Sequence, residues 1–163
     1  MLAVPARADS EVADAQAAIV TRGEFFKVED MHFGMVIPSA VAGVVTLAPT
    51  GVRTATGGVT LVGNTHQAAE FGGRRPGNSN NPLSISVGSN TIQLTGPGAP
   101  MTVSLFRGNV NPNQVLTTVP RNFQVTGQSN GAFELRVGAT LNVNANQAPG
   151  TYSGTWSITV DFQ

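Results

Sequence analysis

The 163-residue chain contains no cysteine and little charge, and these two scarcities exclude several classes of function. Without cysteine, a disulfide or a thiolate metal site is impossible. Nine basic side chains balance nine acidic ones, so no net field attracts nucleic acid or an anionic membrane. No apolar run approaches the ~18 residues of a membrane-spanning helix. The composition predicts no nucleic-acid binding and no membrane insertion, and its wealth of hydroxyl and amide side chains favours an exported β-protein.

Groups that could take part in catalysis are also scarce. His32 lies close to Glu29 and Asp30, but in a strand residue 29 points away from the face that 30 and 32 share, which favours an exposed strand end over a metal site. His66 follows a turn and is expected to be a neutral surface imidazole. The chain has no G-x-S-x-G motif and no glycine-rich phosphate loop. We therefore expect no catalytic residue, metal or cofactor, and no enzyme.

The apolar residues of the chain follow a pattern that is typical of β-strands. After Gly23, short segments of alternating apolar residues are separated by Gly, Pro and Asn turns about every ten residues. This spacing predicts one domain over 23–163, built as an antiparallel sandwich or barrel. Turns are expected at 49–51, 56–58, 88–90, 96–98 and 111–114. Strands are expected near 24–36, 43–48, 58–63, 67–71, 82–87, 90–95, 101–106, 115–126, 132–144 and 150–162.

The last of these segments, GTYSGTWSITVDFQ, alternates most strictly. Burying its large apolar side chains would contribute roughly 10 kcal/mol, which is comparable to the net stability of a domain. Gly154 leaves a gap in their row that another residue must fill. Two interpretations stay open at this point, an edge strand with a free outer edge or a strand paired on both sides. The predicted inward series is Gly150, Tyr152, Gly154, Trp156, Ile158, Val160 and Phe162.

Three polar or weakly patterned segments complete the chain. Residues 1–8 end in the small-x-small pattern of a signal-peptidase site, so they are a possible signal-peptide remnant. Residues 10–20 fit either a helix or a strand with Ala13, Ala15, Ala17 and Ile19 on one side. The loop 72–81, GGRRPGNSNN, is expected to be a solvated tip, with an anion or glycan contact through its paired arginines as the alternative.

The ending resembles the β-zipper pattern of subunits assembled by bacterial chaperone–usher systems, because Gly150 is fourteenth from the end and Phe162 is penultimate. More specifically, the chain from about residue 15 onward is similar to the bacterial domain-of-unknown-function family 4402. Six segments carry that similarity in order: EDMHFG (29–34), GVVTLAPTG (43–51), AAEF (68–71), MTVSLF (101–106), LRVGATLNV (135–143) and GTYSGTWSITVDF (150–162). The loop 72–81 departs from the family pattern.

The resemblance implies an incomplete immunoglobulin-like sandwich that is exported through the periplasm and finished by a donated strand. A periplasmic chaperone would lend the strand first, an outer-membrane usher would secrete the subunit, and the next identical subunit would replace the chaperone in a surface fibre serving adhesion or biofilm formation. The extension 1–22 would be the donor, through Val12, Ala13, Ala15, Ala17 and Ile19. The acceptor groove would be lined by the inward series of 150–162. Pairing of 10–20 within its own domain, and a monomeric secreted module that binds glycan or matrix, remain the alternatives.

Overall fold

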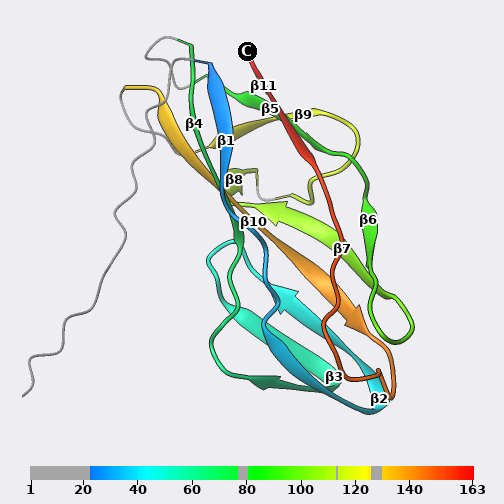
Figure 1. Ribbon diagram of the computed structural model, residues 1–163. Helices are drawn as coiled ribbons and strands as arrows, with labels where there is room; N and C mark the ends of the chain where they lie inside the picture. Colours follow the sequence, from blue (N-terminus) through cyan, green and yellow to red (C-terminus); the bar gives the residue numbers. More distant parts are fainter. Residues whose placement is uncertain (1–22, 77–80, 113, 126–129) are drawn as a thin grey trace, which may run out of the picture.

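The computed structural model describes residues 23–76, 81–112, 114–125 and 130–163, which form the all-β fold of Figure 1. The strands pair antiparallel in two sheets that are arranged as a sandwich and do not close into a barrel. The predicted antiparallel sandwich is therefore confirmed. Among the described residues there is no helix with the length and apolarity that crossing a bilayer requires.

The larger sheet has seven strands in the order β1-β4-β10-β2-β3, with β7 pairing β10 and β6 pairing β7. β10 is its centre, because it pairs with β4 through residues 132–137, with β2 through residues 139–143, and with β7. The strands of this sheet are β1 (Glu24–Glu29), β2 (Met35–Leu47), β3 (Arg53–Val62), β4 (Ala69–Arg74), β6 (Thr91–Leu94), β7 (Met101–Gly108) and β10 (Ala132–Val143).

The smaller sheet has four strands in the order β11-β5-β9-β8, and it lies towards the upper end of the view in Figure 1. Its two end strands in the described part of the chain are β11 and β8. The bounds are β5 (Leu83–Val87), β8 (Val110–Asn111), β9 (Arg121–Val125) and β11 (Ile158–Phe162).

The core lies between the two sheets and follows from alternation along the strands. β4 and β5 each bury every second residue, as half-buried sheets with one face on a core do. Each large apolar side chain that is fully buried contributes ~1.5–3 kcal/mol. The most deeply buried apolar residues, all at 1% exposure or less, come from both sheets and, for Leu116, from the segment between β8 and β9: Val45, Leu47, Ala69, Leu83, Ile85, Val103, Phe106, Leu116, Leu135 and Val137.

Several predicted boundaries are wrong. The expected strand 24–36 is interrupted, because β1 ends at Glu29 and Gly34, whose φ of 72° is a left-handed conformation, directly precedes β2. The expected turn 56–58 lies inside β3, where the pairing with β2 shifts between Pro38 and Gly43 as a bulge. The expected strand 115–126 is reduced to β9 and one bridge from Val115 to Arg107.

The loop 72–81 is the clearest correction. Its first residues extend β4, and Arg75 is only 1% exposed, so it does not belong to a solvated tip. The burial of Ala69, Phe71 and Gly73 shows the reason, because Arg75 continues the same inward alternation. Arg74, one residue earlier, is partly exposed.

Candidate functional site

The outer edge of β11 is the most unusual feature of the described fold. β11 pairs with β5 on one side, and no strand of the described ranges pairs with its other side. Gly88 N–H donates to Ser157 C=O at 2.9 Å, so residues 157, 159 and 161 direct their backbone groups at β5. By the alternation of an antiparallel ladder, the N–H and C=O groups of Ile158, Val160 and Phe162 point away from β5. The strand therefore presents a row of backbone donors and acceptors on its free side.

The same three residues turn their side chains inward but are not fully covered. Together with Trp156 they form what we call the β11 face: Trp156, Ile158, Val160 and Phe162, all partly buried against the core. Their direct partners on β5 are 0% to 3% exposed, so the apolar side chains of β11 are less buried than those of the neighbouring strand β5. The pairs are Ile158–Val87, Val160–Ile85 and Phe162–Leu83.

Aromatic rings connect the β11 face to the edge strand of the other sheet. Trp156 stacks on Phe106 at 5.1 Å between centroids and meets the edge of Phe71 at 5.8 Å. Phe162 contacts the Phe133 ring at 6.2 Å. From β1, Phe25 stacks on Phe71 at 5.3 Å and on Phe133 at 6.4 Å. Thus the end strands β1 and β11 share one aromatic cluster, and Phe25, Trp156 and Phe162 remain partly exposed.

The segment before β11 differs from the expected strand 150–162. Only residues 158–162 form β11, and Ser153 makes an isolated bridge to Thr95 just after β6. The chain therefore follows β6 and then β5, crossing from the larger sheet to the smaller one. This crossing breaks the regular ladder between Ser153 and Ser157.

Three members of the predicted acceptor series lie in this crossing segment. The Tyr152 hydroxyl accepts a hydrogen bond from Gly98 N–H and donates one to Ala148 C=O, each at 2.9 Å. It therefore links the loop that contains Gly98 to the loop that contains Ala148. At Gly154 the backbone of β6 approaches closely, and a Cβ there would collide with the Gln93 carbonyl oxygen. The gap expected at Gly154 is therefore filled by β6. Gly150 is exposed with a φ of 142° next to Pro97.

A match to one protein-family model covers residues 24–162, nearly the whole described chain. The family is the Domain of unknown function DUF4402. This chain is a member of DUF4402. Neither the curated proteins nor the solved structures contain a match to it. Membership confirms the family resemblance, and the family description carries no activity with it. The donor residues Val12, Ala13, Ala15, Ala17 and Ile19 lie outside both the matched range and the described residues.

Arg75 is a residue of this DUF4402 domain whose burial the sequence interpretation missed. Its Nε donates to Asn81 C=O at 3.0 Å and one Nη donates to Val125 C=O at 2.9 Å, while the guanidinium lies 5.1 Å from the centre of the Phe133 ring. The other Nη is buried without a hydrogen-bond partner in the described structure. Burial lowers the pKa of the Arg75 guanidinium from its ordinary value because the charged form is desolvated.

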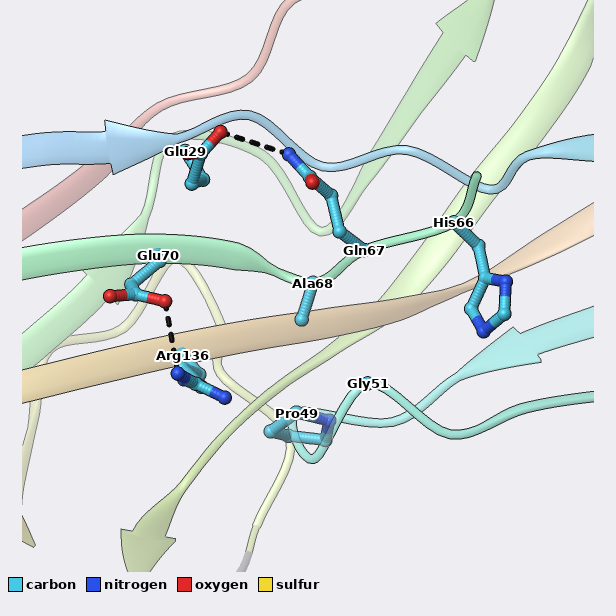
Figure 2. A pocket seen from close by; sticks show the side chains of 8 residues that line it. All are labelled: Glu29, Pro49, Gly51, His66, Gln67, Ala68, Glu70 and Arg136. Carbon is cyan, nitrogen blue, oxygen red and sulfur yellow. Dashed lines mark hydrogen bonds and ion pairs between the residues drawn. The ribbon is translucent and has the colours of Figure 1, made fainter. Parts of the chain in front are cut away.

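A hollow in the DUF4402 domain, of about 200 Å³, lies near the β2–β3 turn and the start of β4 (Figure 2). Most of the polar side chains that line it form ion pairs or hydrogen bonds with one another. Arg136 is 3.1 Å from the Glu70 carboxylate, and Gln67 donates to Glu29 at 3.1 Å. The internal pairing leaves little charge for a ligand. His66 also lines this hollow, and it is partly buried rather than a fully exposed surface imidazole.

The acidic residues near His32 have partners of their own. Asp30 forms an ion pair with Lys27 at 2.8 Å, and Glu29 accepts the hydrogen bond from Gln67. His32 is exposed and its backbone bridges to Gln67. The described ranges hold no group of three His, Asp or Glu side chains arranged to bind a metal ion.

Proposed function

We propose that this DUF4402 protein is a structural subunit of an extracellular bacterial fibre that polymerises head to tail by donating a strand to the β11 edge of its neighbour. One observation supports this most directly. The β11 face is partly exposed while the paired residues of β5 are almost fully buried, and among the described residues no further strand covers this side of the smaller sheet. Adding a strand at a sheet edge supplies both backbone partners and side-chain cover.

Residues 9–20 of a neighbouring copy suit this edge. Their alternating alanines are small, and small side chains fit beside large ones such as Trp156 and Phe162. Each backbone hydrogen bond to the outward groups of β11 would add ~0.5–1.5 kcal/mol to the burial of the β11 face. A junction with several such bonds and a covered aromatic cluster would dissociate slowly.

Head-to-tail donation makes a contact that does not close on itself, and contacts of that kind generate filaments. The chaperone, the usher and the role in adhesion or biofilm formation come from the resemblance of residues 150–162 to chaperone–usher subunits. An exported location follows from the same resemblance. The alternative of a monomeric glycan- or matrix-binding module is weakened, because one of the two arginines on which its loop depended, Arg75, is buried.

The test is assembly of the purified full-length chain, followed by negative-stain electron microscopy. We expect filaments from the wild type and none from Ala17→Asp, because a carboxylate would have to enter the apolar cluster behind β11. Ala18→Asp is the matched control. It makes the same change one residue along, on the opposite face of the strand, so its filaments should be retained.

Deletion of residues 1–20 should also abolish filaments while leaving a monomer with β-sheet circular dichroism. Undiminished filaments from the deletion variant would contradict the proposal. A stable monomer from the wild type under all assembly conditions would favour the binding module instead.

A further inference from the structure

Arg75 is a buried cation at the end of β11, and the described structure gives it no acidic partner. Its guanidinium lies against Phe133, the ring that also contacts Phe162, and it donates to the carbonyl of Asn81. The Asn81 side chain in turn donates to the carbonyl of Gln163 at 3.4 Å. Arg75 is therefore placed at the carboxyl end of β11, next to the partly exposed part of the aromatic cluster.

Both hydrogen bonds of the Arg75 guanidinium go to backbone carbonyls, and no ion pair between described residues includes it. The ion pairs between described residues join Asp30 to Lys27, and Glu70 and Glu134 to Arg136. Residues 77–80, shortly after Arg75, and residues 126–129, directly after its hydrogen-bond partner Val125, contain no Asp or Glu. A buried guanidinium with one nitrogen left without a partner is costly, so an occupant of the edge that brings a carboxylate would be favoured.

The candidate donor segment carries such a carboxylate on the correct side. Glu11 has the same parity as Ala13, Ala15, Ala17 and Ile19, so in a strand it lies on the face that enters the groove. Asp14 lies on the opposite face. If the donor runs antiparallel to β11, Glu11 reaches the end of the edge where Arg75 is buried. If it runs parallel, that end meets Thr21 and the cation Arg22 instead.

We propose that Glu11 of a neighbouring copy pairs with Arg75 and thereby fixes the direction and register of the donated strand. This inference rests on the proposed function and specifies the direction and the register of the donated strand. The strand runs antiparallel to β11, with Ala15 opposite Val160. The remaining pairs are Ala13 with Phe162, Ala17 with Ile158 and Ile19 with Trp156.

Cysteine cross-linking tests the register, since the chain has no cysteine of its own. Full-length Ala15→Cys/Val160→Cys is assembled and oxidised with copper-phenanthroline, beside Ala13→Cys/Val160→Cys as the matched control. We expect a ladder of covalent oligomers on a non-reducing gel from the first pair and little from the second. A ladder from the control pair alone would overturn the register while retaining strand donation. Cross-linked monomers alone would show that 9–20 fills its own groove, and would overturn the proposed function as well.

The ion pair itself is tested by Glu11→Gln, with Asp14→Asn as a control that removes the same charge from the opposite face. Filaments of Glu11→Gln should form but dissociate in urea at least about tenfold faster than the wild type, because Arg75 is then left buried without a carboxylate. Asp14→Asn should dissociate at the wild-type rate. Equal rates for Glu11→Gln and the wild type would overturn the pairing.

Discussion

At the scale of single residues, Arg75 shows what a composition-based interpretation overlooks. Two adjacent arginines between glycines and asparagines are typical of a solvated loop, yet only Arg74 fits that description. Continuing the alternation from Ala69 through Phe71 and Gly73 would have placed Arg75 inward. The sequence contained the signal. It was outweighed by the usual expectation that charged residues are exposed, which fails when a guanidinium can donate to backbone carbonyls and stack on a ring.

Tyr152 gives a prediction that belongs to one side chain. Tyr152→Phe keeps the ring against the core but leaves Gly98 N–H and Ala148 C=O without their shared partner. The free energy of unfolding of the monomer should fall by about 1–2 kcal/mol. Urea denaturation followed by circular dichroism measures this. Thr155→Val, at an exposed hydroxyl in the same segment, should leave the midpoint unchanged, and an equal loss in both variants would contradict the assigned role.

At the scale of elements, period-2 alternation predicted most strands, and the turns at 49–51, 88–90 and 96–98 lie between strands as expected. The error at residues 56–58 has a clear physical origin. Glycine marks both turns and bulges, and only the partner strand decides which of the two forms. At 56–58 the facing residues of β2 continue past the glycines with a register shift, so the segment stays paired.

The bulge carries a prediction about close backbone approach. Gly58→Ala would place a Cβ against the Val41 carbonyl oxygen, which lies in the β2 bulge and accepts a hydrogen bond from the Ser39 hydroxyl. The free energy of unfolding should fall by about 1–3 kcal/mol. Gly51→Asn is the comparison, because that turn has a φ of 85° and open space, and Asn tolerates such a backbone. It should cost well under about 1 kcal/mol by chemical denaturation. A smaller loss at Gly58 than at Gly51 would rule out the steric explanation.

At the scale of the whole molecule, the sequence predicted the sandwich but not which strands end its sheets. That choice depends on non-local pairing, such as β11 beside β5 and β1 beside β4, and alternation within one strand carries no information about its neighbours. The structure brings only some members of the proposed acceptor series together. Trp156 and the residues of β11 lie together, whereas Tyr152 and Gly154 serve the crossing between the sheets. An apolar residue in an extended segment can pack inward without lining the edge.

The free side of β11 gives a prediction that separates the monomer from the assembled state. Residue-resolved hydrogen exchange in the monomer should show fast exchange for the amides of Ile158, Val160 and Phe162, which point away from β5, and slow exchange for Thr159 and Asp161. In filaments the first three should slow by about 100-fold or more, because a donated strand accepts their hydrogen bonds. Thr159 and Asp161 are internal controls, since they face β5 in both states. Slow exchange at Val160 already in the monomer would mean that a strand of the same molecule covers this edge.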